Sequence, residues 1–461
     1  MGDAYDLVVI GGGSGGVRAA RVSAQLGARV ALVEGARMGG TCVNVGCVPK
    51  KLLSYGARFG EALDDMRGYG WSTTGRRFDW SALIAAKDRE IERLNGVYRG
   101  LLDRAGVTVV EGWARVTGPE TVSVALAGGG ERELRGERLL VAVGGKPWRP
   151  SADEVPGIEQ TWVSDDLFAL PELPPRVLIV GAGYIGCEFA TIFRGLGVQV
   201  TLAHRSDLPL RGFDEEVRRF LAQQMAASGI ECITGCMPTY IDRDHNGLRV
   251  RWSDGGTSHA DGILMATGRI PNTAGLGLED VGVALGPEGS VPVDERFCTT
   301  VPSIFAVGDV IDRVQLTPVA LAEATAFAHQ QFADDRALSY ENVPSAVFTS
   351  PQLGTVGLCE AKARAKYGDI DVYASTFRSL VHTLTGRDRK SMLKLLVDRA
   401  SDRLVGVHIV DPDAAEIAQG FAAAMQAGIT KRQLDATIGI HPTVAEELVT
   451  MRTPRTDSAV P

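Results

Sequence analysis

The stretch DLVVIGGGSGG, residues 6–16, decides the fold, because a short apolar run in it leads directly into a cluster of glycines. Residues 6–10 have the composition of a buried parallel strand, and residues 11–16 match GxGxxG, the turn that starts the helix of a dinucleotide-binding βαβ unit. A second apolar run, residues 28–33, ends at Glu34, eighteen residues beyond the last glycine. Such glycines let backbone N–H groups approach a pyrophosphate, and a carboxylate at the second strand's tip suits a ribose diol. The segment is therefore predicted to bind a dinucleotide.

The same arrangement recurs about 170 residues later. An apolar run at residues 177–180 leads into GAGYIG, residues 181–186, and another apolar run follows at residues 198–203. One GxGxxG alone is a weak signal, but two, each placed between a predicted strand and a predicted helix, favour two dinucleotide sites.

Composition excludes several other classes of protein. The 461 residues are 45% hydrophobic and 23% charged, which is typical of a globular chain and excludes a disordered one. The net charge of −8 has the wrong sign for a nucleic-acid-binding protein, and no apolar stretch reaches the roughly 18 residues that a membrane span needs. The N-terminus lacks a basic segment leading into an apolar run, so we expect a soluble cytoplasmic protein with no nucleic-acid or membrane partner.

The rest of the chain indicates a third domain. Residues 81–105 carry apolar side chains at helical spacing, and a proline-rich segment, residues 147–175, precedes the second glycine turn. An apolar run at residues 304–309 leads into a predicted helix over residues 318–332. After about residue 340 the pattern changes to strands followed by helices, which predicts an α+β domain.

Two of the seven cysteines, Cys42 and Cys47, lie five residues apart in GGTCVNVGCVPKK, residues 39–51. Five residues of regular helix rise about 7.5 Å, whereas a relaxed disulfide needs Cα atoms about 4.4–6.8 Å apart. A bridge would therefore require a distorted backbone near Gly46, and a distorted, accessible disulfide suits repeated reduction and exchange. Two free cysteines of the core are the alternative.

Residues 39–51 resemble the active-site motif of the flavin-dependent disulfide reductases, the class I pyridine nucleotide-disulfide oxidoreductase family. The resemblance covers nearly the whole chain and is strongest to the plant and bacterial members that reduce glutathione disulfide. Its other motifs are the two glycine turns, ATGRIPN at residues 266–272, GD at residues 308–309 and HPT at residues 441–443.

This resemblance implies an α/β fold with two Rossmann-like dinucleotide-binding domains, one for FAD and one for NADPH, plus a C-terminal α+β dimerisation domain. The implied domains are an FAD-binding domain in two segments, residues 1–150 and 271–338, an NADPH-binding domain, residues 151–270, and an interface domain, residues 339–461. The chain is therefore expected to form a homodimer.

By the same resemblance, electrons pass from NADPH to FAD, then to a Cys42–Cys47 disulfide, and finally to bound glutathione disulfide. Cys47 is expected against the flavin as the charge-transfer thiolate, and Cys42 is expected to attack the substrate sulfur. Lys50 would lie near flavin N5, paired with Glu188, which places positive charge where the reduced ring gathers negative charge. Tyr184 resembles the aromatic gate that covers the flavin until the nicotinamide displaces it.

Exchange also requires a proton donor for the departing thiolate. His441 and Glu446, five residues on, match the family's His–Glu pair. In the family this histidine serves the cysteines of the neighbouring subunit, which implies that the active site is complete only in the homodimer.

The carboxylates of glutathione disulfide need cationic partners. Arg18 and Arg21 lie one turn apart on the first predicted helix, on one face. Val97 and Tyr98 match the family's glutathione site, where the tyrosine hydroxyl can assist the exchange. Thr325 departs from one pattern, because some glutathione-reducing members have a carboxylate-binding arginine there; plant-type members resemble this chain at that position.

The second glycine turn indicates which nicotinamide donor binds. Eighteen residues beyond Gly186 the chain has His204 where the first unit has Glu34, and Arg205 and Arg211 follow. Arginine offers a 2′-phosphate a fixed charge and a bidentate fork, so NADPH is preferred over NADH. The spacing of the two arginines also matches the NADPH-binding pair of the family, and two solvated surface arginines are the alternative.

The glycine turns and family motifs together predict the cofactor contacts. The predicted cofactor-binding residues are Gly11, Gly13, Ser14, Gly15, Gly16, Glu34, Gly40, Thr41, Gly181, Gly183, Tyr184, Ile185, Gly186, Arg205, Arg211, Gly268, Arg269, Gly308, Asp309 and Thr317.

Two other functions remain open. Dihydrolipoamide dehydrogenase shares the cysteine pair but uses NAD⁺ and normally keeps an acidic residue where His204 stands. A non-catalytic flavoprotein that binds two nucleotides would not need Cys42, Cys47, Lys50 and His441 together. Cys232 and Cys236 have no neighbouring histidine or second pair, so they are predicted to be structural and no metal site is expected.

Overall fold

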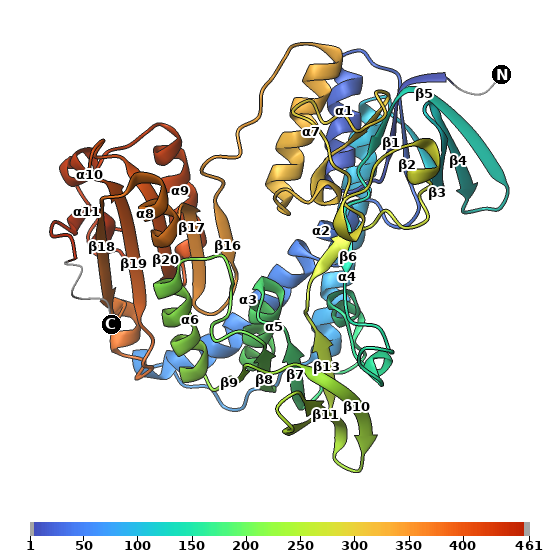
Figure 1. Ribbon diagram of the computed structural model, residues 1–461. Helices are drawn as coiled ribbons and strands as arrows, with labels where there is room; N and C mark the ends of the chain where they lie inside the picture. The colour runs from blue at the N-terminus through green and yellow to red at the C-terminus, as the bar shows by residue number, and fades with distance from the viewer. Residues whose placement is uncertain (1–3, 456–461) are drawn as a thin grey trace.

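The computed structural model describes residues 4–455, which form three lobes, each surrounding its own sheet (Figure 1). The first lobe contains both ends of the predicted FAD-binding part, the second follows the second glycine turn, and the third lies at the C-terminal end of the chain. None of the helices in residues 4–455 is long and apolar enough to span a lipid bilayer.

The first lobe is built on a parallel sheet. Its parallel strands, in spatial order, are β3 (Thr108–Gly118), β2 (Val30–Glu34), β1 (Ala4–Ile10), β5 (Glu131–Val141) and β15 (Ile304–Ala306). β4 (Thr121–Leu126) pairs antiparallel with one end of β3 and one end of β5. Helices α1 (Ser14–Gln25) and α7 (Thr317–Phe332) pack against each other beside this sheet, and strand residues such as Leu7 and Leu32 are fully buried.

The second lobe repeats the plan of the first. Its parallel strands, in spatial order, are β13 (Gly262–Met265), β7 (Arg176–Val180), β8 (Gln199–His204) and β9 (Glu231–Thr234). Its helices are α5 (Tyr184–Gly195) and α6 (Glu215–Ala227), and an antiparallel sheet is added by β10 (Pro238–Asp244), β11 (Gly247–Trp252) and β12 (Thr257–Ala260). Both glycine turns therefore lie between a strand and a helix, as predicted.

The third lobe is an antiparallel sheet with helices. Its strands, in spatial order, are β16 (Ser345–Val347), β17 (Gln352–Gly357), β20 (Leu404–Asp411), β19 (Ser391–Asp398) and β18 (Ile370–Phe377). Its helices are α8 (Glu360–Tyr367), α9 (Ala414–Gln426), α10 (Lys431–Ala436) and α11 (Glu447–Thr450). Every residue of β19 and β20 is buried, and the predicted change to strands and then helices is confirmed.

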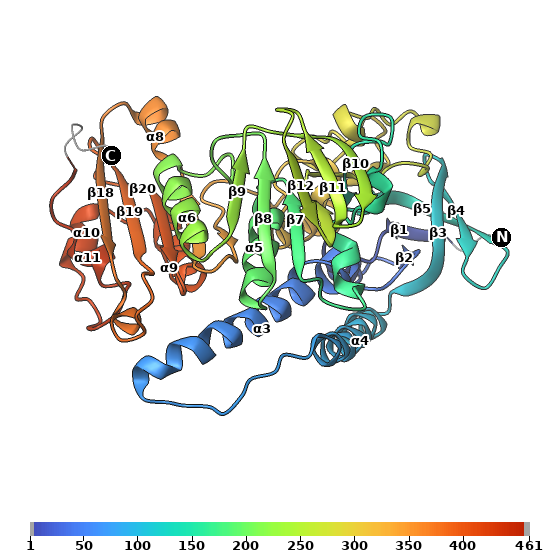
Figure 2. The same cartoon turned by 90° about the horizontal axis from the view of Figure 1, so that it is seen from below.

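Two long helices connect the lobes. α2 (Gly40–Asn44) leads into α3 (Cys47–Asp65), which extends from the first lobe toward the third, and α4 (Trp80–Arg104), close to its predicted bounds, returns (Figure 2). α3 packs directly on α5 of the second lobe. The contact is so close that a Cβ added at Gly60 would lie 2.7 Å from the carbonyl oxygen of Gly195. α3, which begins at Cys47, and α5, which begins in the second glycine turn, therefore touch along their backbones.

The remaining short elements join these parts. β6 (Gly145–Pro147) pairs with β14 (Arg269–Pro271) where the chain passes between the first and second lobes. Single 3₁₀ turns occur at Met66–Tyr69, Ile158–Gln160, Ser164–Ala169, Glu279–Val281, Pro287–Gly289, Gly308–Ile311 and Leu380–Thr383.

Candidate active site

The cysteine pair lies across a break between two helices. Cys42 is in α2, Cys47 is the first residue of α3, and Gly46 between them has φ −149° and ψ −121°, outside the helical region. A Cβ at Gly46 would lie 2.7 Å from the carbonyl oxygen of Thr41, so the break needs glycine. The predicted distortion near Gly46 is confirmed. Cys42 and Cys47 are both free, and each is the largest single influence on the other's pKa.

The two sulfur atoms have opposite electrostatic environments. The hydrogen bond from Cys42, aided by Thr317 and the charge of Lys50, lowers the pKa of Cys47 to about 6. Cys47 also begins a 19-residue helix, whose positive end stabilises a thiolate. The bond to Cys47 and burial raise the pKa of Cys42. At neutral pH the pair therefore holds one thiolate, on Cys47, and one thiol, on Cys42.

Lys50 and Glu188 form the predicted ion pair. Lys50 Nζ lies 2.7 Å from Glu188 Oε1, and both side chains are buried. The same carboxylate oxygen accepts a hydrogen bond of 2.8 Å from the backbone N–H of Phe348, whose ring lies 4.2 Å from Lys50 Nζ. Because Lys50 is one turn from Cys47, its fixed position brings positive charge to the thiolate.

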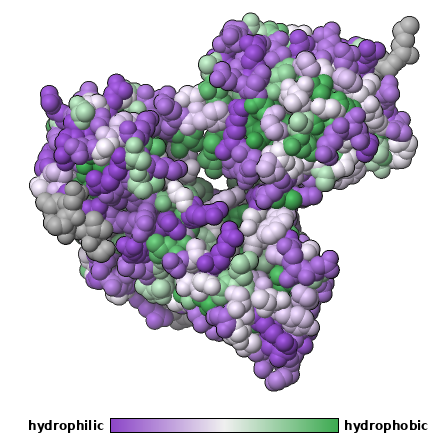
Figure 3. All heavy atoms as spheres, in the orientation of Figure 1, coloured by the Kyte–Doolittle hydropathy of each residue, from purple (hydrophilic) through white to green (hydrophobic). Residues whose placement is uncertain are grey.

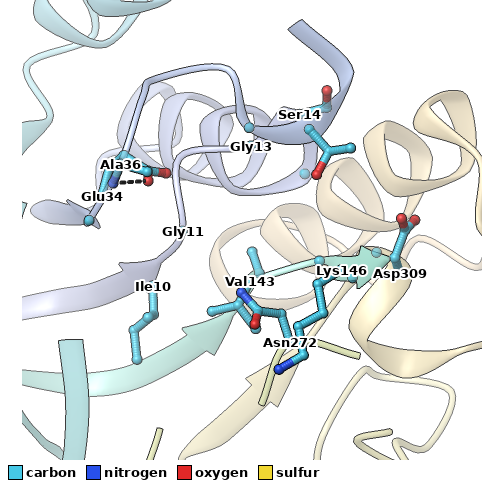
Figure 4. A pocket seen from close by; sticks show the side chains of 18 of the residues that line it. Ile10, Gly11, Gly13, Ser14, Glu34, Ala36, Val143, Lys146, Asn272 and Asp309 are labelled. Carbon is cyan, nitrogen blue, oxygen red and sulfur yellow. Dashed lines mark hydrogen bonds between the residues drawn. The ribbon is translucent and has the colours of Figure 1, made fainter. Parts of the chain in front are cut away.

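A cavity of about 630 Å³ begins at the first glycine turn, where Figure 4 shows Gly11, Gly13, Ser14 and Glu34 around it, and reaches Cys42. At one end Glu34 accepts hydrogen bonds from the N–H groups of Gly12 (2.6 Å) and Ala36 (2.7 Å). At the other end the wall includes Cys42 and Thr317. Ten of the predicted cofactor residues line this cavity: Gly11, Gly13, Ser14, Gly15, Glu34, Gly40, Thr41, Gly308, Asp309 and Thr317.

The walls of this cavity suit an extended anionic dinucleotide. A Cβ at Gly16 would lie 1.9 Å from the carbonyl oxygen of Gly11, so no side chain fits on that side of the turn, whereas a Cβ at Gly13 would make only an ordinary 3.8 Å contact with Gly40. α1 begins at Ser14 and α7 at Thr317, so both helices direct their positive ends toward the cavity. Burial raises the pKa of Asp309 on the opposite wall.

The second glycine turn has the same backbone form as the first, and the loop that carries Arg205 and Arg211 lies near it. A Cβ at Gly186 would lie 1.9 Å from the carbonyl oxygen of Gly181, and the space beside Gly183 is open. Arg205 and Arg211 are exposed, and neither makes a hydrogen bond or ion pair with any residue in the range 4–455. Burial lowers the pKa of His204, so this side chain is neutral and the loop's charge comes from the arginines.

The other predicted cofactor residues of the second unit lie at the beginning of α5 or next to and within β14. Tyr184 is the first residue of α5 and is exposed, with Ile185 next to it in the helix. Arg269, next to Gly268, donates a hydrogen bond of 2.5 Å to the carbonyl oxygen of Gly145 and interacts electrostatically with Asp309. Arg269 is in β14, which pairs with β6 where the chain passes between the first and second lobes, so this side chain lies where the two lobes meet.

Of the residues predicted to serve the substrate, Tyr98 interacts with the cysteines. Burial raises the pKa of Tyr98, whose hydroxyl also interacts electrostatically with Cys42 and Arg18. Val97, the residue before Tyr98 on α4, is exposed. On α1, Arg21 lies one turn beyond Arg18, and the buried Nε of Arg21 has no hydrogen-bond partner among the described residues.

The predicted His–Glu pair is present but remote. His441 Nδ1 lies 3.0 Å from Glu446 Oε2 and 3.1 Å from Oε1, and the histidine side chain is 82% exposed. It lies next to α11 in the third lobe, and within residues 4–455 no hydrogen bond or ion pair connects it to the cysteines. One chain therefore brings together the cysteine pair, Lys50, Glu188 and Tyr98, but not His441.

Sequence reasoning missed the side chain that holds the Gly308–Asp309 turn. Glu323 on α7 is buried and accepts hydrogen bonds from the N–H of Gly308 (2.7 Å) and the hydroxyl of Tyr340 (2.8 Å). Burial raises the pKa of Glu323. A single carboxylate in the otherwise apolar run VALAEATAF was the available signal. His408, predicted to be a core histidine, is buried and bonded to Thr355 and Leu358.

Comparisons with known proteins agree with this geometry. The sequence profile of the pyridine nucleotide-disulphide oxidoreductases matches residues 5–324, and that of their dimerisation domain matches residues 343–452. The chain is 48% identical over 453 residues to the glutathione reductase of Burkholderia cepacia, covering 98% of this chain and 99% of that protein. It is 44% identical over 463 residues to the glutathione reductase of Nostoc sp., covering 97% and 99%. It is also 44% identical over 463 residues to the chloroplastic/mitochondrial glutathione reductase of Pisum sativum, covering 98% and 82%.

Proposed function

The chain belongs to the pyridine nucleotide-disulphide oxidoreductase family, and from that premise we propose that it reduces glutathione disulfide to glutathione with electrons from NADPH. The observation that carries the proposal is the cysteine pair: Cys42 lies in the wall at one end of the large cavity, and Cys47, whose pKa is lowered whereas that of Cys42 is raised, begins the next helix. A relay of two electrons from a cofactor in the cavity to a disulfide outside it needs such an asymmetric pair.

FAD fits the large cavity. Bound there, it would supply the two-electron transfer from nicotinamide to the cysteine pair. The N–H groups of the first glycine turn would hold its pyrophosphate, Glu34 a ribose, and Asp309 the chain that leads to the flavin. Lys50, fixed by Glu188, keeps a positive charge at the cysteine end, where negative charge gathers on reduction.

The exchange steps use the residues around the dithiol. His441 of the partner subunit takes the proton of Cys42, whose thiolate attacks one sulfur of glutathione disulfide and releases the first glutathione as a thiolate, to which the histidine returns the proton. Cys47 then attacks Cys42 in the mixed disulfide, which releases the second glutathione and leaves the Cys42–Cys47 disulfide. Tyr98 interacts electrostatically with Cys42, and its hydroxyl is proposed to assist the exchange.

NADPH is the proposed electron donor. Its pyrophosphate suits the open side of the second glycine turn, and Arg205 and Arg211 are free to bind a 2′-phosphate because no other described residue pairs with them. Tyr184, the exposed first residue of α5, is proposed as the gate over the flavin.

Glutathione carboxylates are proposed to bind Arg18 and Arg21 on α1. Arg21 has a buried nitrogen that still needs an acceptor. Thr325 donates its hydroxyl to the carbonyl oxygen of Leu321 in its own helix, at 2.7 Å, so it is not poised to bind a carboxylate. The substrate site therefore relies on α1 and α4 rather than on α7.

A homodimer is proposed to complete the active site. The dimerisation profile covers the third lobe, and the side chains of Ile438 and Ile440 beside His441 are 94% and 76% exposed in the single chain. Two such large apolar residues next to a catalytic candidate are typical of a covered interface. We assign FAD to residues 1–150 and 271–338, NADPH to residues 151–270 and the interface to residues 339–461.

The function is tested by NADPH oxidation with glutathione disulfide, trypanothione disulfide and lipoamide in parallel. We expect rapid turnover with glutathione disulfide alone, and faster turnover with NADPH than with NADH. Turnover restricted to lipoamide and NAD(H) would instead identify a dihydrolipoamide dehydrogenase, and a flavoprotein that turns over none of the three would be a binding module.

A further inference from the structure

A buried lysine joins the second and third lobes. Lys394 on β19 is 1% exposed, and its Nζ lies 2.9 Å from Asp214 Oδ1, 2.9 Å from Glu216 Oε2 and 2.7 Å from Glu360 Oε2. Arg455 bridges the same two glutamates, at 2.8 Å and 3.0 Å. Asp214 and Glu216 belong to the second lobe and Glu360 to the third, so one cluster of charges fastens the two lobes together. Figure 2 shows α6 between β9 and β20 at this junction.

Asp214 is the centre of the cluster and also the N-cap of α6. Its carboxylate is 1% exposed, accepts the N–H of Val217 in the first turn at 3.5 Å, and accepts the N–H of Glu360 at 2.9 Å. The beginning of α6 is therefore fixed to the third lobe by an ion pair and a backbone hydrogen bond at the same side chain.

The residues just before Asp214 form the loop that carries Arg205 and Arg211. The loop is held from inside its own lobe as well: the N–H of Leu210 donates to the carbonyl oxygen of Ala182 in the second glycine turn, at 2.8 Å. Arg218 on α6 donates to the carbonyl oxygens of Pro209 (2.6 Å) and Leu208 (2.9 Å).

Arg211 thus lies between two anchors, the glycine turn and the beginning of α6. It is only three residues before Asp214, and three residues of chain span at most about 11 Å. A shift of Asp214 is consequently transmitted to Arg211 and, through Arg218, to the rest of the loop.

We propose that Lys394 is a positioning residue for coenzyme discrimination: through Asp214 it holds the arginine loop where both guanidinium groups can bind the 2′-phosphate of NADPH. The inference rests on the proposed function, since it takes Arg205 and Arg211 as the phosphate ligands. It adds that the third lobe, which carries neither arginine, contributes to the choice between NADPH and NADH.

Removal of the lysine charge should act on NADPH selectively. Without Lys394, the carboxylate of Asp214 is left buried with one cation fewer, and such a group moves toward water or draws water in. Either response displaces the first turn of α6 and the loop before it. NADH has no 2′-phosphate and therefore loses little from a displaced arginine pair.

The test compares Lys394→Met with Lys431→Met in the full-length flavin-loaded dimer. Lys431 is also buried, paired with Asp435 and donating to the carbonyl oxygen of Met451 at 2.7 Å, but its partners all belong to the third lobe. It therefore controls for the general cost of removing a buried charge. Two quantities are measured: the Kd of adenosine 2′,5′-bisphosphate by calorimetry, and the KM for NADPH and for NADH.

For Lys394→Met we expect the Kd of the bisphosphate and the KM for NADPH to rise about tenfold, with kcat and the KM for NADH changed less than about twofold. Lys431→Met should leave the ratio of the two KM values unchanged. Equal ratios in the two variants would overturn the proposal. If Lys394→Met does not fold, Lys394→Met with Asp214→Asn removes both charges while an N-cap side chain remains, and a wild-type ratio in that variant would also overturn it.

The wild-type protein separates this inference from the proposed function. If the wild type neither binds adenosine 2′,5′-bisphosphate nor prefers NADPH, the assignment of Arg205 and Arg211 is wrong and the inference falls with it. If the wild type does both and Lys394→Met behaves like Lys431→Met, only the positioning role is wrong.

Discussion

Lys50 Nζ and Glu188 Oε1 lie 2.7 Å apart, although 138 residues separate them in the sequence. Lys50 is in the first turn of the helix that begins at Cys47, and Glu188 is in the helix that begins at Tyr184. The pair therefore fixes the cysteine helix relative to the second glycine turn. Figure 3 shows the lobes separated by a deep hollow, so such local contacts, together with the close approach of Gly60 to Gly195, determine how the two sites face each other.

Glu188→Ala should lower the free energy of unfolding by about 3 kcal/mol, because it leaves the Lys50 ammonium and the Phe348 N–H buried without a partner. Urea denaturation of the flavin-loaded protein measures the change. Glu90→Ala is the control, since Glu90 pairs with Arg93 on the surface and should change stability little. Similar effects of the two substitutions would contradict the buried role of Glu188.

Cys47 of the reduced protein should react with iodoacetamide with a pH midpoint near 6. Its pKa is lowered from 9.0 to about 6, so the reactive thiolate is present above that pH and is lost as the pH falls through it. The hydrogen bond from Cys42 is the largest cause, and Cys42→Ala should therefore move the midpoint toward 9. Mass spectrometry of the peptide that contains Cys47 gives the rates. A midpoint that stays near 6 in Cys42→Ala would show that the helix and Lys50 dominate instead.

Hybrid dimers can show whether His441 acts across the dimer interface. In a dimer of one Cys42→Ser chain and one His441→Ala chain, a histidine acting on the partner's cysteines leaves one site intact, made of the second chain's cysteines and the first chain's histidine. We expect about half of the wild-type activity from purified hybrids, whereas each parent homodimer should lose about 10²-fold or more. Inactive hybrids would mean that His441 serves its own chain.

Arg205→Glu with Arg211→Glu should raise the KM for NADPH by about 10²-fold, since each exposed guanidinium lost is replaced by a charge that repels the 2′-phosphate. The KM for NADH should change little. Steady-state kinetics with both donors decide the matter, and Arg219→Glu, on the same α6 side of the lobe but outside the loop, is a suitable control. Equal changes for the two donors would rule out the arginines as phosphate ligands.

Much of the site could be predicted from the sequence because its parts lie on short motifs. The strand–glycine–helix units and the break at Gly46 were predicted from the residues and are present; the Lys50–Glu188 and His441–Glu446 pairs, which the family resemblance implied, are present too. In each case the chemistry restricts the residue type within a few positions: glycine where a Cβ would collide with a carbonyl oxygen, and a carboxylate where a charged partner is fixed.

The contacts that could not be predicted depend on how distant segments pack. Lys394 and Asp214 lie 180 residues apart, and only the docking of the second lobe on the third brings them together. Glu323 is similar, since its role is evident only when α7 lies beneath the Gly308 turn. Periodicity assigns such residues to a helix or strand, but it contains no information about the partner.

The most direct test of the central claim, that Cys47 relays electrons as a thiolate beside the flavin, is an anaerobic titration of the flavin-loaded protein with NADPH. We expect a long-wavelength charge-transfer band after the first two electrons, and no such band in Cys47→Ser. Reduction of the wild-type flavin without that band, or a band that persists in Cys47→Ser, would contradict the claim.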